Sequence, residues 1–334
     1  MSLALYRKYR PQTFADVVDQ DHVKTTLQNE VKNNQIAHAY VFAGPRGVGK
    51  TTMARLFAKA VNEPKFAPNS LDIIEIDAAS HTGVDHVREQ IIQQAYVAPS
   101  QLAYKVFIID EAHMLSVSAF NALLKILEEP PAQVIFILAT TEAHKLPATV
   151  ISRCQRFDFH AISIPAIIKR LQKLAEAEGV IVEPAVFERI ARRAGGAIRD
   201  AESMLGQVLA VGEKTITAAE ADVVLPRSDI EVVLNLLDCL RAKDATKYIT
   251  VLHQAITDGV HMRELHQHIV EVLRQCLLYS VDTSLEHFTA LDVQATTHER
   301  LIECMKTVTT LDCLRLLDIF TGQQSSSTAQ HYLP

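Results

Sequence analysis

The sequence predicts an α/β fold for the first half of the chain, with a parallel sheet covered by helices on both faces, followed by two helical domains. Three observations lead to this prediction. Continuous apolar runs alternate with helical patterns up to about residue 160, a glycine-rich loop joins one apolar run to a helix, and no convincing strand pattern occurs after about residue 225. Continuous apolar runs are typical of parallel strands buried on both faces.

The first region opens with the basic, aromatic segment YRKYRP, and its elements follow in a regular order. A helical pattern over 20–34 precedes the strand candidate AYVFAG, which leads into the glycine-rich loop and a helix over 50–61. Further strand candidates follow at 71–79, 105–112 and 134–141. This alternation predicts an α/β domain over residues 1–160.

The character of the sequence changes after SRCQRFDFH. Helical segments at 164–180 and 184–212 predict a small helical domain over 161–224, in which Gly179 and Gly212 are placed as C-terminal stops. Residues 229–259 and the segments after them have the pattern of amphipathic helices. They predict an all-α domain over 225–334.

The composition limits the classes of function. The net charge is −6 over 334 residues, so any contact with nucleic acid must use a local basic patch. The chain has no tryptophan and only 6% aromatic residues, which argues against a stacking platform for single-stranded bases.

The same sequence indicates a cytoplasmic location. Five scattered cysteines without a CxxC pair argue against a disulfide framework or a zinc ribbon, and for a reducing compartment. The N-terminus lacks the apolar core of a signal peptide, and no apolar stretch approaches the ~18 residues of a membrane helix.

The glycine-rich loop matches the P-loop pattern GxxxxGK[ST]. Its glycines let backbone N–H groups turn toward phosphate oxygens, Lys50 brings a positive charge to the β- and γ-phosphates, and Thr51 offers a hydroxyl to Mg²⁺. The alternative, a chance match in a turn, is disfavoured by the strand before the loop and the helix after it. We expect the nucleotide to be held by Gly44, Pro45, Arg46, Gly47, Val48, Gly49, Lys50, Thr51 and Thr52.

A second motif, which is acidic, follows about sixty residues later. There the apolar run KVFII is followed by Asp110 and Glu111. At the end of a strand, Asp110 can hold the Mg²⁺ shell and Glu111 can polarise the attacking water. The alternative, that these acids merely cap the next helix, loses weight because a P-loop precedes them.

Four further residues are open to two interpretations. Thr140 and Thr141 end the strand candidate at 134–141, where they either lie beside the attacking water or satisfy the backbone of a turn. Arg153, in SRCQR, and Arg199, in GGAIRDAES, contact a phosphate or are ordinary solvated surface charges.

The order of these motifs resembles the AAA+ clamp-loader ATPases, with the strongest likeness to their bacterial DNA polymerase III gamma/tau branch. The resemblance rests on YRKYRPQTF, GPRGVGKTT, EIDAAS, IIDEAHMLSVSAFNALLKILEEPP, LATTEAHKLPATVISRC and GGAIRDAES, and it is strongest over residues 1–205. It implies an AAA+ P-loop ATPase domain, a lid domain and a collar domain through which subunits associate. It also implies that ATP with Mg²⁺ drives the loading of a sliding clamp onto primed DNA.

The resemblance assigns roles residue by residue. Thr141, with Thr140, corresponds to sensor 1, and Arg199 corresponds to the sensor 2 arginine that reaches from the lid to the nucleotide. Arg153 corresponds to the arginine finger that enters a neighbouring subunit's ATP site, an effect worth ~10³–10⁵ in rate in related phosphoryl transfers. The segment around the adenine corresponds to Tyr9, Arg10, Pro11, Val17 and Val18.

The implied partners are delta- and delta-prime-type subunits, further copies of this chain, the sliding clamp and primer-template DNA bound without sequence specificity. Arg88, Ser116 and Thr149 are the candidate DNA contacts, the last two as helix N-termini facing phosphates. For Arg88 a plain surface charge is an equal alternative.

The sequence departs from this family in two places. Between residues 60 and 71 it carries AVNEPKFAPNSL, where the bacterial subunits have a four-cysteine zinc module, so no zinc is expected. Replication factor C small subunits also lack that module and remain an alternative. The chain ends in TGQQSSSTAQHYLP where the family has a further helix, so we expect a truncation within the third domain.

Two other classes remain as rivals. A non-hydrolysing stator subunit of the delta-prime type needs a damaged P-loop, whereas Gly49, Lys50, Thr51 and Glu111 are intact. A helicase, suggested by the letters DEAH, needs a second nucleotide-binding fold, and residues 161–334 have no second series of strands.

Overall fold

The computed structural model describes residues 4–66, 70–80, 91–211, 215–221, 224–225, 230–257, 260, 262–281, 300–304 and 309–322. The chain divides into two compact units, Met1–Val224 and Leu225–Pro334. Among the described residues, no helix is long and apolar enough to cross a membrane.

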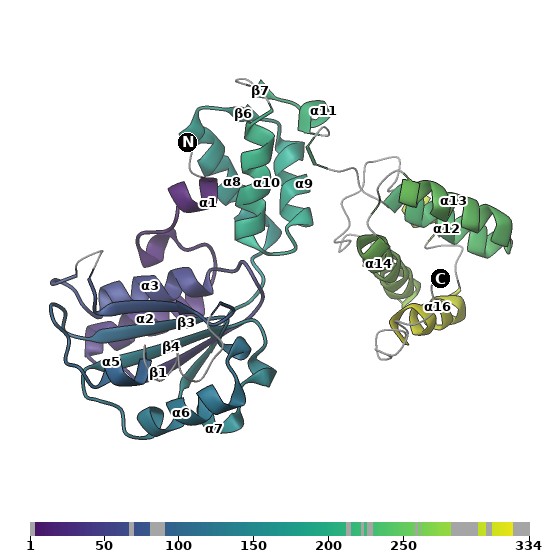
Figure 1. The fold of residues 1–334 in the computed structure, drawn as a ribbon. Coiled ribbons are helices and arrows are strands. Elements are labelled where there is room, and N and C mark those ends of the chain that lie inside the picture. The colour runs from purple at the N-terminus through teal and green to yellow at the C-terminus, as the bar shows by residue number, and fades with distance from the viewer. Residues whose placement is uncertain are drawn as a thin grey trace. The chain divides into compact units, whose positions relative to one another are not determined.

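A five-stranded parallel sheet forms the centre of the first unit (Figure 1). The strand order is β2-β3-β4-β1-β5, so the chain crosses over between non-neighbouring strands. Every residue of the three inner strands except Asp110 is buried, which explains their continuous apolar sequences. The strands are β1 (Ala39–Ala43), β2 (Ile73–Asp77), β3 (Lys105–Asp110), β4 (Val134–Thr140) and β5 (Gln155–Asp158).

Successive side chains of each strand enter opposite cores. Tyr40 and Phe42 pack in the cluster with α2 (Asp21–Asn33) and α3 (Lys50–Ala60), whereas Val41 packs in the cluster with α6 (Val117–Glu128). Figure 1 shows α2 and α3 on one side of the sheet, and α6 and the short α7 (Ala148–Ile151) on the other. Burying one large apolar side chain contributes about 1.5–3 kcal/mol to stability. Many such side chains are buried on both faces, so the two cores hold the sheet, and with it the carboxyl ends of its strands, in place.

Strand β5 was not predicted from the sequence. It pairs in parallel with β1 at the sheet edge, and Phe157 is its only buried residue. The QRFD sequence has a single apolar residue in four, which gives almost no strand signal. Its physical consequence is clear, because β5 continues into Phe159, whose N–H donates to the carbonyl oxygen of Ala43 at 2.7 Å beside the glycine-rich loop.

Helices make up most of the rest of the first unit. Gly179 ends α8 with φ 71°, as predicted, whereas the expected segment 184–212 is two helices separated by Gly195 and Gly196, both at positive φ. Gly212 lies outside the described residues. The elements are α8 (Ile164–Glu178), β6 (Ile181–Val182), α9 (Pro184–Arg193), α10 (Ile198–Leu209), β7 (Thr215–Ile216) and α11 (Ala218–Ala221).

The N-terminal helix α1 (Leu5–Lys8) packs against α10 rather than against the sheet (Figure 1). Lys8 pairs with Glu178 at 2.8 Å, and Arg170 donates to the carbonyl oxygen of Tyr9 at 2.5 Å. The chain then crosses to the sheet. Short elements complete the unit: η1 (Phe14–Asp16), α5 (Gln93–Ala95), η3 (Ala112–Met114) and η4 (Ala143–Lys145).

In the second unit, every described element is a helix: α12 (Ile230–Ala242), α13 (Ala245–Thr257), α14 (Met262–Val281), the short helical stretch 300–304 and α16 (Thr310–Gly322). Leu234, Val272 and Leu301 belong to its apolar core. The predicted fold class, a parallel-sheet domain followed by helical domains, is confirmed.

Candidate functional site: a P-loop pocket

The glycine-rich loop joins β1 to α3 at the carboxyl edge of the sheet. Gly44 donates its N–H to the carbonyl oxygen of Thr140 at 3.2 Å, and a Cβ at Gly44 would come within 2.3 Å of the Phe159 carbonyl oxygen. Gly47 adopts φ 76°, and a Cβ there would lie 2.9 Å from Ala197 Cβ. Glycine is therefore required at both positions by close approach and by the backbone conformation, since Gly44 also has a positive φ, 147°.

Lys50 is the first residue of α3, and its ammonium group folds back over the loop. It donates to the carbonyl oxygens of Gly44 at 2.8 Å and Pro45 at 2.7 Å. Burial lowers the pKa of Lys50, while the nearby carboxylates of Glu111 and Asp110 raise it. The loop thus holds one buried positive charge at the N-terminus of a helix, the arrangement that favours phosphate.

Two oxygen donors lie together at the end of β3. Thr51 donates its hydroxyl hydrogen to Asp110 Oδ2 at 2.8 Å, and Asp110 Oδ1 accepts the backbone N–H of Glu111 at 3.0 Å. A hydroxyl and a carboxylate are the hard oxygen ligands that Mg²⁺ takes alongside water and phosphate. The donor set therefore fits this ion.

Glu111 has a left-handed backbone conformation, φ 48°, where β3 turns into η3. Such a conformation is uncommon for a non-glycine residue. Thr141 donates its hydroxyl hydrogen to Glu111 Oε2 at 3.3 Å. The carboxylate is thereby held at the carboxyl edge of the sheet, between strands β3 and β4.

Sequence reasoning missed His113, which lies behind this carboxylate. The His113 ring nitrogen Nδ1 is 3.1 Å from Thr140 Oγ1 and 3.5 Å from Glu111 Oε2, and Nε2 is 3.4 Å from Glu142 Oε1. The imidazole side chain is only 8% exposed. The ring therefore links the ends of β3 and β4. In the sequence, the only signal for this role was the position of His113 three residues after Asp110 in DEAH.

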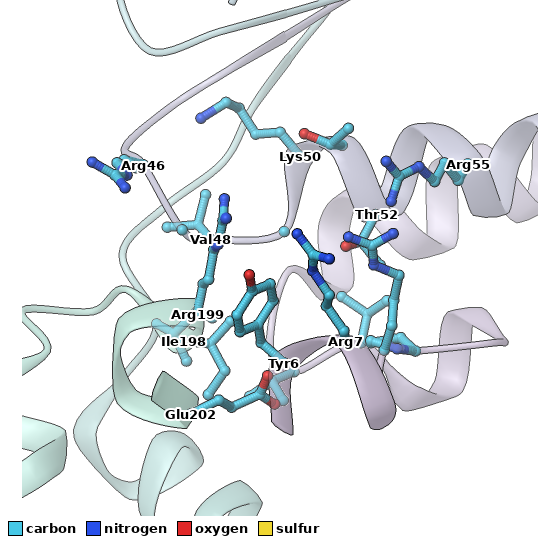
Figure 2. Close-up of a pocket in the computed structure, with 18 of the residues that line it drawn as sticks. Tyr6, Arg7, Arg46, Val48, Lys50, Thr52, Arg55, Ile198, Arg199 and Glu202 are labelled. Carbon is cyan, nitrogen blue, oxygen red and sulfur yellow. The ribbon is translucent and has the colours of Figure 1, made fainter. Parts of the chain in front are cut away.

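The loop opens into a pocket of about 330 Å³ that is rich in positive charge (Figure 2). Seven cationic residues line it against three carboxylates. Such an excess favours a polyanionic ligand. The lining residues are Tyr6, Arg7, Arg10, Pro11, Val17, Val18, Arg46, Gly47, Val48, Gly49, Lys50, Thr51, Thr52, Arg55, Asp110, Glu111, Ile162, Arg170, Ile198, Arg199 and Glu202.

Residues of α1 and α10 close the pocket on the side away from the sheet. Arg199 donates its backbone N–H to the Gly47 carbonyl oxygen at 3.3 Å, which joins α10 to the glycine-rich loop. Arg170 donates to Glu202 Oε1 at 2.8 Å in a largely buried ion pair. Burial raises the pKa of Glu202, and the Arg170 guanidinium opposes that rise.

Sequence reasoning missed Tyr6, Arg55, Arg170 and Glu202. Tyr6 belongs to the YRKYRP segment, whose aromatic and basic character was the only signal. The others lie on α3, α8 and α10, where single charged residues are indistinguishable in sequence from solvated surface positions. Only the folded chain brings them to one pocket.

Most of the predicted nucleotide contacts meet in this pocket. Its lining includes the residues from Arg46 to Thr52, together with Asp110, Glu111 and Arg199, and Arg10, Pro11, Val17 and Val18 from the N-terminal segment. Tyr9 does not line it, and instead offers its carbonyl oxygen to Arg170. Thr140 and Thr141 contact His113 and Glu111 from the end of β4.

The remaining predicted residues lie elsewhere. Arg153 does not line the pocket of its own chain; it donates to Glu128 Oε1 and to the Thr149 carbonyl oxygen, both at 2.7 Å, and its side chain is 34% exposed. Ser116 caps α6 by accepting the N–H of Ala119 at 3.2 Å. Thr149 is exposed on α7, and Arg88 lies outside the described residues.

Comparison with family models identifies two consecutive segments. Residues 19–163 match the model described as DNA polymerase III, delta subunit. Residues 166–214 match the model described as DNA polymerase III clamp loader subunit, ATPase lid domain. The α8–α10 region is therefore similar to a lid domain.

Curated relatives extend the likeness over most of the chain. DNA polymerase III subunit gamma of Buchnera aphidicola is 37% identical over 296 residues, which cover 84% of this chain and 80% of the relative. The chain belongs to the DNA polymerase III gamma/tau family. DNA polymerase III subunit tau of Bacillus subtilis is 44% identical over 299 residues, 85% of this chain and 53% of the relative. The chain thus spans about half the length of that gamma/tau relative.

The fold of this gamma/tau family member is also found among solved structures. The Thermotoga maritima RuvB Holliday junction branch migration motor aligns with a TM-score of 0.55 at 20% identity, covering 70% of this chain and 79% of the other. At this identity the likeness is one of fold alone. It agrees with the predicted AAA+ arrangement of a P-loop sheet domain followed by a lid.

Among the described residues, no group of three or more histidine, cysteine or acidic residues is placed to hold a metal ion. The expected absence of zinc stays a prediction.

Proposed function

We propose that the chain is the ATPase subunit of a DNA polymerase III clamp loader, which uses ATP binding and hydrolysis to load a sliding clamp onto primed DNA. The observation that carries this proposal is the joining of the glycine-rich loop, the Thr51–Asp110 pair, Glu111 and Arg199 in one pocket. The proposed domains are the ATPase domain at 1–160, the lid at 161–224 and a collar at 225–334.

The pocket suits a nucleoside triphosphate. Backbone N–H groups of the loop and the N-terminus of α3 face the phosphates, and Lys50 adds a charge next to them. Pro11, Val17 and Val18 supply apolar surface for the base. The cations at the opening of the pocket offset the charge of the terminal phosphate.

Hydrolysis needs a polarised water and a stabilised transition state. Glu111, held by Thr141, accepts a proton from the attacking water, while Lys50 and Arg199 stabilise charge on the phosphoryl oxygens. Thr51 and Asp110 would hold Mg²⁺, which neutralises phosphate charge when bound. Thr140 fixes the end of β4 through its contact with His113.

Arg153 has a different role in the proposal. Because it points away from the pocket of its own chain, it would act in the site of a neighbouring copy or of another clamp-loader subunit. An arginine supplied in trans contributes about 10³–10⁵ in rate in related enzymes. Hydrolysis would then depend on assembly.

The proposed partners are delta- and delta-prime-type subunits, further copies of the chain, the clamp and primer-template DNA, in the cytoplasm. Ser116, Thr149 and Arg88 remain the proposed DNA contacts, with no reading of base sequence. Contacts to phosphate weaken as salt rises. Substituting Arg88 by alanine should therefore reduce the affinity for primed duplex, and with it the stimulation of hydrolysis at subsaturating DNA, most strongly at low salt, and the difference in affinity should shrink as the salt concentration rises.

The deciding experiment is the ATPase rate of the chain with its partner subunits, measured with and without a sliding clamp and primed DNA. Joint stimulation by clamp and DNA supports the proposed motor. A flat response contradicts it and favours a non-hydrolysing stator subunit or an unrelated AAA+ role.

A further inference from the structure

The N-terminal helix α1 is fastened to the lid region at three points. Leu5 is buried against α10, within 3.7 Å of the position that a Cβ on Gly206 would take. Lys8 pairs with Glu178, and the carbonyl oxygen of Tyr9 accepts a hydrogen bond from Arg170. Tyr6 is therefore presented to the pocket from a fixed piece of backbone.

The ring of Tyr6 lies against Arg199, as Figure 2 shows. The Arg199 guanidinium carbon is 4.8 Å from the ring centroid, and that of Arg7 is 5.7 Å from the same centroid. Hydrogen bonding from these arginines, with Arg199 first, lowers the pKa of the Tyr6 hydroxyl. The ring thus contacts two cations that line the same pocket.

The surroundings of Arg199 are otherwise electrostatically unfavourable for a cation. Arg199 lies in the first turn of α10, where the helix dipole disfavours a cation, and Arg46 and Lys50 line the same pocket. The buried carboxylate of Glu202 is already paired with Arg170. Among the described residues, no carboxylate pairs with Arg199, and the face of Tyr6 is the attractive surface it contacts.

An aromatic ring holds a guanidinium in a way that suits later phosphate binding. A carboxylate would occupy the N–H donors in a charge-assisted pair, which a phosphate would have to displace. A cation–π contact is weaker and leaves most of the five N–H donors free. In a P-loop the backbone N–H groups cradle the α- and β-phosphates, so a guanidinium that lines the pocket outside the loop is available to the terminal phosphate.

We propose that Tyr6 is a positioning residue for Arg199, and that its ring holds the guanidinium ready to contact the terminal phosphate of a nucleoside triphosphate. The proposal rests on the proposed nucleotide-binding function. It makes Tyr6 a determinant of the preference for triphosphate over diphosphate. A purely structural tyrosine would affect both nucleotides equally.

The test is the ratio of the dissociation constants for ADP and ATP, measured by competition against a fluorescent ATP analogue on the whole chain. Tyr6→Leu should lower the preference for ATP about two- to fivefold, the range for one exposed cation–π contact, and leave ADP binding within about twofold. Tyr6→Phe keeps the ring and should retain most of the preference. In an Arg199→Ala background, Tyr6→Leu should change the ratio no further.

The exposed tyrosine Tyr96 provides a matched control, because Tyr96→Leu removes a ring outside the pocket and should leave both constants unchanged. Equal weakening of ATP and ADP by Tyr6→Leu, or an undiminished effect of that change without Arg199, overturns the positioning role. If the unsubstituted chain binds neither ATP nor ADP, and is indistinguishable in this assay from the Lys50→Ala variant, the proposed function fails and this inference fails with it.

Discussion

The floor and the rim of the pocket are built by different physical means. The floor, defined as the glycine-rich loop with Lys50, Thr51, Asp110, Glu111 and Thr141, is positioned by buried strands and by hydrogen bonds to the backbone. The rim, defined as Tyr6, Arg7, Arg170, Arg199 and Glu202, consists of side chains from helices α1, α8 and α10.

Floor and rim residues differ in how firmly the fold fixes their positions. Floor groups cannot move without disturbing the sheet, which suits them to hold phosphates and a water molecule in one geometry. Rim groups are held by ion pairs and by a cation–π contact, which side-chain rotation can break. We therefore expect floor substitutions to alter binding and turnover, and rim substitutions other than those of Arg199 to alter stability and nucleotide preference.

The largest effect is expected outside both regions, at Arg153. Arg153→Ala should lower ATP turnover by the assembled complex about 10³–10⁵-fold, because a neighbouring site loses its guanidinium, and should leave ATP binding by the isolated chain unchanged. ATPase rates in the complex, with equilibrium binding by the chain alone, measure the two quantities. Arg156→Ala is the matched control, since Arg156 pairs with Asp158 on β5. Normal turnover by Arg153→Ala with intact partners would show that the pocket hydrolyses ATP without a guanidinium from a neighbouring chain.

Glu111→Gln is the sharpest test of the floor. Loss of the general base should reduce turnover about 10²–10⁴-fold, while ATP remains bound with about unchanged affinity. Single-turnover hydrolysis and filter binding measure these two effects. Glu129→Gln, an acid at the end of α6 and outside the pocket, should match the unsubstituted protein. A large loss of affinity in Glu111→Gln would mean that this carboxylate builds the floor rather than acting on water.

Lys50→Ala should remove the buried charge that the loop holds over its own carbonyl oxygens. We expect ATP affinity to fall by about 100-fold or more, at the upper end for charge-assisted hydrogen bonds. Calorimetric titration measures the loss. Lys59→Ala, on the last turn of the same helix, is the control. Retained affinity in Lys50→Ala would place phosphate binding on the rim instead.

Arg170→Leu tests the rim through stability. Glu202 would stay buried without its counter-charge, so the free energy of unfolding at pH 7.5 should fall by about 3–5 kcal/mol. Denaturant unfolding measures it, with exposed Lys169→Leu as control.

The same variant has a defined pH dependence. Burial raises the Glu202 pKa, and losing Arg170 raises it further. A carboxyl whose pKa is raised in the folded state stabilises the protein below its unfolded pKa and loses that contribution as the pH rises through the raised value. Arg170→Leu should therefore regain stability near pH 5, and an equal deficit at pH 5 and pH 7.5 would exclude an unpaired buried carboxylate.

The smallest effect is expected at Thr141. Thr141→Val keeps the shape but removes the hydrogen bond to Glu111, so turnover should fall about two- to tenfold with ATP affinity unchanged. Steady-state kinetics separates the two quantities. A change in affinity alone would assign Thr141 to nucleotide binding rather than to positioning the base.

The floor residues could be singled out from the sequence because they are close in sequence or lie at strand ends. Lys50 and Thr51 follow the glycines directly, and Asp110 ends a continuous apolar run. Strand β5 was missed because an edge strand with a single buried residue has almost no pattern. His113 was missed because its role depends on Thr140, Glu111 and Glu142 meeting at one ring.

Local chemistry by itself therefore determined the glycine-rich loop, the acidic strand end and the alternation of apolar runs, since backbone conformation and burial act over a few residues. Tertiary structure alone decided the rim, apart from Arg199, which the family resemblance had already singled out. Tyr6, Arg170 and Arg199 are far apart in the chain, and a guanidinium gains a specific partner only when folding brings a ring or a carboxylate within a few ångströms.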